Sequence, residues 1–184
     1  MRSAALARDK SVLNLFGYTG GFSLHAAVAG ASRTDTVDVA RPAIEAAQRN
    51  FDLNGLSTKD AGFYAEDAFE FLEHAARRHE TWDIVISDPP SFAPRKDALP
   101  AARVAYTRLH RLAALVTAPG GLLCAASCSS HVTREDFLRT INDGVYAARR
   151  RWRLESLHGA AFDHPVLEAF PEGDYLKFAM GRVD

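Results

Sequence analysis

The sequence lacks long hydrophobic runs, and it contains only two cysteines. None of its apolar stretches approaches the roughly 20 residues that cross a bilayer, and residues 1–10 lack the apolar core of a signal peptide. Cys124 and Cys128 fall on one predicted strand, where a rise of about 3.3 Å per residue separates them by about 13 Å, too far for a disulfide. These absences predict a cytoplasmic protein with reduced thiols and no membrane partner.

An excess of charge of one sign is also lacking. The formal net charge is −1 over 184 residues, which provides no general attraction for nucleic acid, and there is no internal repeat or low-complexity tract. The length suits one domain, residues 1–184. We interpret the local basic clusters as solvated helix faces; they are Arg95 and Lys96, then Arg103, Arg108 and Arg111, then Arg149, Arg150, Arg151 and Arg153.

What the sequence does contain is a regular alternation of predicted strands and helices. Residues 12–23, VLNLFGYTGGFS, run from an apolar strand through a glycine-bearing turn into a helix, which is typical of the first unit of a doubly wound α/β sheet. The expected strands are 12–16, 34–39, 62–65, 84–88, 122–130, 152–159 and 174–181, with a turn at 119–121. The expected helices are 20–29, 41–54, 100–117 and 133–149, with one more beginning at 66–67.

Polar or glycine residues stand where four of the expected strands end. These positions are the turn at 16–21, Asp38, Asp88 and Cys128, and Asp67 joins them from the third strand–helix unit. In an open parallel sheet, ligands bind beyond the carboxyl ends of the strands. The sequence therefore predicts a ligand site at this edge.

The spacing of the first two strand ends indicates the type of ligand. Asp38 lies 21 residues after Gly17, where a carboxylate can accept both hydroxyls of a ribose, although a plain helix N-cap is the alternative. The dinucleotide fingerprint Gly-x-Gly-x-x-Gly fails, because Thr19 and Phe22 stand where glycines are required. A nucleoside without phosphate, such as S-adenosylmethionine (SAM), suits the turn better.

Two further carboxylates, Asp67 and Asp88, could likewise either bind a ligand or have a purely structural role. Asp67 could accept an adenine amino group beside Ala68 and Phe69, or it could simply cap a helix. Asp88 is followed by Pro89 and Pro90, which end the strand and leave free carbonyls. Such a rigid floor can hold a planar, amine-bearing substrate, or it can be no more than a strand ended by prolines.

Cys128 is the candidate nucleophile. A thiolate can add to an electron-poor carbon when its pKa is low, and the alternative is an inert core cysteine, as we expect for Cys124. His131 could contact the substrate, tune the thiol or have no role. We find no further ligands at metal-binding spacing around Cys128 and His131, so no metal site is expected.

Five stretches together resemble the catalytic domain of the bacterial large-subunit ribosomal RNA methyltransferases that make 5-methylcytosine in 23S rRNA, a class I SAM-dependent family. They cover nearly the whole sequence: VLNLFGYTGGFSLHAA, VDVARPAIEAAQRNFDLNGL, WDIVISDPPSF, APGGLLCAASCSSHVTREDF and DHPVLEAFPEGDYLKFAM. The resemblance implies a Rossmann-like sheet of seven mostly parallel strands, with the last strand antiparallel and helices on both faces. The RNA-binding PUA domain and β-hairpin of these relatives are not in this sequence.

The resemblance also implies roles for individual residues. Cys128 matches the nucleophile, which would attack cytosine C6 so that C5 accepts the methyl group, and Asp88 would border the transfer site. The residues expected to hold SAM are Phe16, Gly17, Tyr18, Thr19, Gly20, Gly21, Asp38, Val39, Asp67, Ala68, Asp88 and Pro89. The implied partner is RNA, with 23S rRNA favoured, and a homodimer stays open.

Other functions remain as alternatives. The Asp-Pro-Pro-Ser-Phe stretch also resembles the motif of methyltransferases that act on exocyclic amines, and related paralogues methylate guanine N7 in the same rRNA. Neither reaction needs a thiol. An accessory module that binds SAM or RNA without activity, and a small-molecule methyltransferase, are further possibilities.

Overall fold

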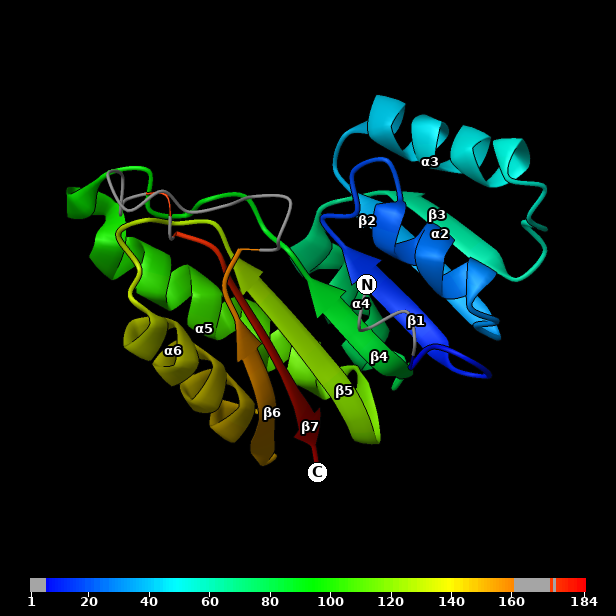
Figure 1. The fold of residues 1–184 in the computed structure, drawn as a ribbon. Coiled ribbons are helices and arrows are strands. Elements are labelled where there is room, and N and C mark those ends of the chain that lie inside the picture. The colour runs from blue at the N-terminus through cyan, green and yellow to red at the C-terminus, as the bar shows by residue number, and fades with distance from the viewer. Residues whose placement is uncertain (1–5, 161–172, 174) are drawn as a thin grey trace.

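The computed structural model describes residues 6–160, 173 and 175–184. Within these residues, seven strands form one sheet in the order β3-β2-β1-β4-β5-β7-β6 (Figure 1). The strands are β1 (Ser11–Leu15), β2 (Arg33–Asp38), β3 (Ala61–Ala65), β4 (Trp82–Ser87), β5 (Thr117–Ser127), β6 (Trp152–His158) and β7 (Lys177–Val183). The helices are α2 (Gly21–Val28), α3 (Arg41–Leu53), α4 (Ala68–Arg77), α5 (Leu99–Leu115) and α6 (Arg134–Ala147), with a short 3₁₀ helix, η1 (Lys96–Ala98).

Strand directions follow the predicted pattern. Strands β3, β2, β1, β4 and β5 pair in parallel, whereas β7 lies antiparallel between β5 and β6. Helices α2 and α3 lie on one face of the sheet, and α4, α5 and α6 cover the other (Figure 1). The expected class I architecture, with seven mostly parallel strands and an antiparallel last strand, is confirmed.

The core follows from the two-residue period of the strands. In β4, Ile84 and Ile86 pack in the cluster on the α2 side, and Val85 between them packs in the larger cluster on the α4–α6 side. All three side chains are buried, which confirms that this continuous apolar run is a strand covered on both faces. Every helix in residues 6–160 is too short or too polar to cross a bilayer.

The main departure from the expected elements is β5. It begins at Thr117 and includes residues 119–121, which we expected to form a turn before the strand. The pairing with β4 shifts register there, because β4 advances from Trp82 to Ile84 while β5 advances from Thr117 to Leu122. The Pro-Gly-Gly stretch is therefore a bulge within a strand. The other bounds differ by a few residues, and position 174, expected to start the last strand, lies outside the described residues.

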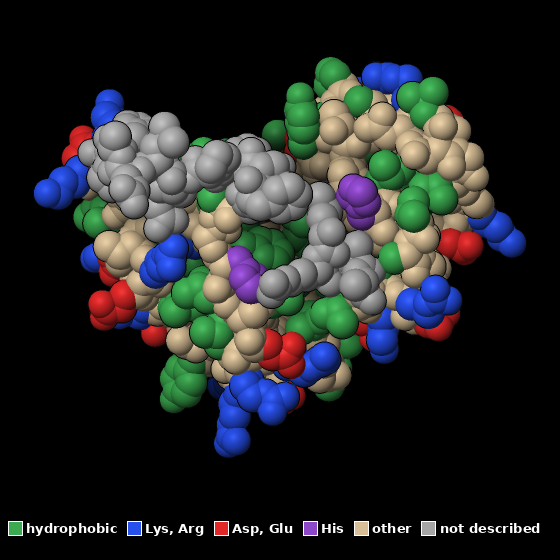
Figure 2. Space-filling view, viewed as in Figure 1, with side chains coloured by type: hydrophobic (Ala, Val, Ile, Leu, Met, Phe, Trp, Pro, Cys, Tyr) green, Lys and Arg blue, Asp and Glu red, His purple; other side chains and the backbone are tan. Residues whose placement is uncertain are grey.

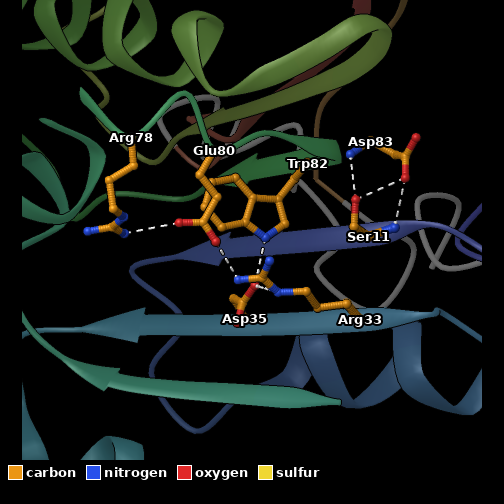
Figure 3. Close-up of polar contacts among 7 residues, drawn as sticks. All are labelled: Ser11, Arg33, Asp35, Arg78, Glu80, Trp82 and Asp83. Carbon is orange, nitrogen blue, oxygen red and sulfur yellow. Dashed lines mark hydrogen bonds and ion pairs between the residues drawn. The ribbon is translucent and has the colours of Figure 1, made fainter. Parts of the chain in front are cut away.

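A closed polar network joins strands near their amino-terminal ends (Figure 3). Asp35 of β2 is 1% exposed and accepts hydrogen bonds from Trp82 Nε1 and Arg33 Nε, both at 2.6 Å. Arg33 also pairs with Glu80 at 2.7 Å, and Glu80 pairs with Arg78 at 3.0 Å. Because the buried carboxylate has two strong donors, its desolvation is offset, and the network links β2 to β4 past β1, which lies between them.

Candidate active site

The turn between β1 and α2 holds its backbone in an unusual shape. Phe16 and Tyr18 have φ angles of 55° and 46°, in the left-handed region that non-glycine residues rarely adopt. The turn is fixed to β2, since Gly17 N donates to Val37 O and Tyr18 N donates to an Asp38 carboxylate oxygen, both at 2.9 Å. Such strain persists only where its surroundings enforce it, and it is common at ligand sites.

Two glycines of this turn meet different surroundings. A Cβ atom on Gly17 would lie 2.6 Å from Thr36 Cγ2, so the close packing of the turn on β2 requires this glycine. A Cβ atom on Gly21 would meet nothing within 4 Å. The packing of the protein does not explain the glycine at position 21, which leaves open space at the start of α2.

A buried polar cluster lies next to the turn at 16–21 and joins the elements that flank it. Asn14 Nδ2 and Thr36 Oγ1 both donate to Ser23 Oγ, at 3.2 and 2.6 Å, and thereby join β1, β2 and α2. Asn50 of α3 donates to Thr19 O at 2.9 Å. Asn14 interrupts the apolar strand in the sequence, and its place in this cluster explains why.

A cavity of about 490 Å³ lies beside the turn, at the carboxyl ends of the strands. Its lining residues are Phe16, Asp38, Val39, Asp67, Ala68, Phe69, Asp88, Pro90 and Phe92. Six of these are residues expected to hold SAM. The lining does not include the expected residues Gly17, Tyr18, Thr19, Gly20, Gly21, Pro89 and Cys128. Topology thus brings together side chains from four separate strand–helix units.

Two carboxylates that line the cavity, those of Asp38 and Asp67, also accept hydrogen bonds from backbone amides. Asp38 accepts from Tyr18 N and Ala40 N through different oxygens, both at 2.9 Å, and the N-cap of α3 is Ala40. Asp67 is the N-cap of α4 and accepts from Phe69 N at 2.9 Å. The capping alternative is therefore correct for Asp67, but both carboxylates still face the cavity and retain lone pairs.

Asp88 is in a different electrostatic position. Solvent reaches its carboxyl group through the cavity, yet the surrounding protein removes much of its hydration and raises its pKa above the usual range. In residues 6–160 and 175–184, no side chain forms an ion pair with it. The Asp88 carboxyl group therefore stays protonated to a higher pH than an ordinary aspartate.

The two cysteines differ as expected. Burial raises the pKa of Cys124 to about 12, so this thiol is inert core material. Cys128 follows the last residue of β5, is partly exposed, and its Sγ donates to Pro89 O at 4.0 Å. The structure therefore places the candidate nucleophile against the Asp88-Pro89 floor, next to the cavity. His131 is exposed in the same turn.

Buried polar residues hold the Cys128 turn. Ser127 Oγ lies 3.0 Å from the Tyr106 hydroxyl, and Ser129 Oγ donates to Ala93 O at 3.0 Å. Lys177 of β7 donates from Nζ to Ser129 O and Val132 O, at 2.6 and 2.7 Å. Tyr106, Phe92 and Lys177 were not predicted from the sequence. The only signal was a lysine within an apolar strand.

The arginine clusters agree in part with their interpretation as solvated faces. On α5, Arg103 pairs with Asp136 of α6 at 2.8 Å and Arg108 pairs with Glu73 of α4 at 2.7 Å. On the face that Figure 2 shows, basic side chains lie mostly around the periphery, with acidic ones among them. Arg150 is different, because it is partly buried and donates to the carbonyls of Ala114, Thr117 and Val183.

A family model described as S-adenosylmethionine-dependent methyltransferase matches residues 3–156. The chain belongs to this methyltransferase family. Its curated relatives include "Ribosomal RNA large subunit methyltransferase I" of Photobacterium profundum, 41% identical over 178 residues, which are 96% of this chain and 45% of that protein. The protein of the same name from Shewanella denitrificans is 37% identical over 182 residues, which are 98% of this chain and 46% of that protein. The methyltransferase chain thus spans about half the length of these relatives.

A solved structure connects the fold to the cofactor. The structure of SMU.776, described as a methyltransferase complexed with SAH, is 31% identical with a TM-score of 0.83, and the match covers 95% of this chain and 46% of that one. SAM is the cofactor of the family, and the site fits it. The cavity size is typical of ligand pockets, its walls include Phe16, Phe69 and Phe92, and Gly21 leaves open space beside the turn.

Proposed function

We propose that this methyltransferase modifies ribosomal RNA, and that it methylates C5 of a cytosine through a covalent bond to Cys128. The observation that carries the proposal is the contact between Cys128 Sγ and Pro89 O, at 4.0 Å. It brings a partly exposed thiol to the strand end where Asp88 lines the cavity. The curated relatives, which are named as large-subunit rRNA methyltransferases, support RNA as the substrate.

The cofactor would occupy the cavity beside the glycine turn. In this arrangement Asp38 accepts the ribose hydroxyls, Asp67 and Ala68 border the adenine, and residues 16–21 hold the methionine part. Val39 lines the same cavity as Asp38. When bound, SAM supplies a methyl group on a sulfonium and leaves as SAH.

The residues of the chain would prepare the base for that methyl group. The Cys128 thiolate adds to C6, and the electron pair of the C5–C6 double bond makes C5 nucleophilic. After C5 has gained the methyl group, a base removes the C5 proton, the S–C6 bond breaks and the thiolate is restored. The target base must leave its stack to reach the site.

Asp88 and Pro89 would hold the ring during addition. A protonated Asp88 carboxyl, favoured by its raised pKa, can donate to N3 and draw electrons away from C6. The Pro89 carbonyl accepts from the thiol in this structure. When the thiol loses its proton, this carbonyl becomes available for the cytosine amino group, so one acceptor would serve both states.

The proposal is tested with Cys128→Ala and the matched control Cys124→Ala. We expect Cys128→Ala to reduce transfer to C5 of 23S rRNA cytosine by more than about 1,000-fold, with unchanged SAM affinity measured by calorimetry. Cys124→Ala should keep its activity, because that thiol is buried in the core. Methylation at C5 by the Cys128→Ala protein would contradict the covalent route.

One observation favours a second candidate, methylation of an exocyclic amine. Asp88, Pro90 and Phe92 line the cavity, whereas Cys128 lies next to it. An amine held on the Asp88-Pro89 floor needs no thiol. Full activity of the Cys128→Ala protein, with the methyl group mapped to a base nitrogen, would support this reaction.

A further inference from the structure

Lys177 is a buried cation behind the candidate nucleophile. It is the first residue of β7, it is paired in register with Ser127 of β5, and it is 4% exposed. A buried ammonium group is expensive to desolvate, so it persists where strong acceptors compensate. Here those acceptors include Ser129 O at 2.6 Å and Val132 O at 2.7 Å.

Both carbonyls belong to the turn that carries Cys128. By binding them together, the ammonium fixes residues 129–132 to β7. The Ser129 hydroxyl is a second anchor of the same turn, because it donates to Ala93 O at 3.0 Å. Cys128 therefore lies between the end of β5 and an anchored turn, and its Sγ donates to Pro89 O.

We propose that Lys177 is a positioning residue for Cys128, which clamps the thiol-bearing turn and places a positive charge that favours the thiolate. This inference rests on the proposed covalent mechanism. A cation next to a cysteine stabilises the thiolate, and a surrounding of low polarity strengthens the effect. The two hydrogen bonds to the turn and the positive charge of the ammonium group are separate contributions, and different substitutions of Lys177 can remove them separately.

The other titratable groups around the turn act on the same thiol. Asp88 lies at the end of β4, Tyr106 comes from α5, and His131 belongs to the turn itself. Burial raises the pKa of Tyr106, the hydrogen bond with Ser127 partly offsets this, and the nearby Cys128 and Asp88 add smaller increases.

The test measures the rate at which iodoacetamide alkylates Cys128, as a function of pH and without RNA or SAM. The thiolate displaces iodide, so the rate follows the thiolate fraction, and peptide mass mapping assigns the modified cysteine. The variants, in a Cys124→Ala background, are Lys177→Gln, Lys177→Met and Lys177→Arg. Gln keeps N–H donors without the charge, Met removes both, and Arg keeps both. Lys59→Met, at an exposed loop position, is the control.

We expect Lys177→Gln and Lys177→Met to alkylate about tenfold more slowly at pH 7, with the midpoint of the pH profile shifted upward by about one unit. Lys177→Arg and Lys59→Met should keep the wild-type profile. Lys177→Met should also lower kcat for methyl transfer with little change in KM for SAM. An unchanged alkylation profile in Lys177→Gln, with circular dichroism showing a folded protein, would overturn the inference.

The two proposals fail in distinguishable ways. If the alkylation profile shifts but the wild-type protein forms no 5-methylcytosine, the positioning of the thiol stands and the cytosine mechanism is wrong. If the wild-type protein forms 5-methylcytosine and the Lys177 variants match it in both profile and kcat, the role of Lys177 is wrong. Should Lys177→Met fail to fold, the comparison of Gln with Arg still separates charge from structure.

Discussion

At the amino-terminal side of the sheet, Asp35 accepts from two strong donors through one carboxylate oxygen, whereas at the carboxyl edge Asp88 has no ion-pair partner among the described residues. Asp35 binds Trp82 and Arg33, and the network continues through Glu80 to Arg78 (Figure 3). Beside it, Ser11 N and Oγ both donate to Asp83 at 2.9 Å. Side chains in this region form hydrogen bonds and ion pairs mainly with one another.

The carboxyl edge is arranged for a different purpose. Asp38 and Asp67 bind backbone amides and still face a cavity, and Phe16 and Tyr18 hold left-handed backbone angles. The two edges belong to one sheet, so their difference does not come from the fold class. At the amino-terminal side, polar side chains bond to one another and stabilise the protein. At the carboxyl edge, polar groups face the cavity where a ligand is expected.

The largest effect within this comparison is expected for Asp88→Asn. Loss of the acidic group should reduce kcat/KM for RNA methylation by about 1,000-fold. Stability should respond in the opposite way. Because the folded-state pKa of Asp88 is raised, its contribution to stability is lost as the pH rises from the unfolded value through the folded one. The variant should therefore have an unchanged or higher Tm at pH 7, and a lower Tm would contradict this account.

The reverse pattern is expected for Asp35→Ala. Removal of this buried carboxylate leaves Trp82 Nε1 and Arg33 without their acceptor, and the free energy of unfolding should fall by about 3 kcal/mol. Urea titration followed by circular dichroism measures the loss. The SAM affinity of the folded fraction should stay as in the wild type. A loss of SAM binding without destabilisation would contradict the assignment of Asp35 to stability and of the carboxyl edge to ligand binding.

The smallest effect is expected for Gly21→Ala, with Gly17→Ala as its control. At position 21 the new methyl group meets no protein atom, so Tm should not change, while SAM affinity should fall by about tenfold if the open space receives the cofactor. Gly17→Ala places a Cβ atom against Thr36 and should destabilise the fold by about 1–3 kcal/mol. Unchanged SAM affinity in Gly21→Ala would remove position 21 from the site.

The edge of the sheet was predictable because local patterns and topology agree there. The apolar strands, the glycine turn after the first strand and a carboxylate at or just after the ends of the next three are visible in the sequence, and a parallel sheet brings these ends together. Asp38, Asp67 and Asp88 line one cavity for that reason. The identity of Cys124 as core material followed from its place within the strand.

The groups that support the site could not be predicted in the same way. Lys177 and Tyr106 act on the Cys128 turn from elements 21 to 48 residues away in sequence, and such contacts depend on tertiary packing. Arg150 belongs to an arginine run that resembles a solvated face, but it binds buried carbonyls. Gly120 and Gly121 indicate a turn locally, whereas pairing of β5 with β4 makes them a bulge.

The central claim is tested most directly by incubating the protein and SAM with an rRNA fragment that contains 5-fluorocytosine. The fluorine cannot leave as a proton does, so a covalent mechanism halts with the enzyme bound to the base. We expect a methylated RNA adduct, stable to denaturation, that peptide mapping places on Cys128. Methyl transfer to unmodified RNA at C5, with no adduct on the fluorinated RNA or with an adduct on another residue, would contradict the account.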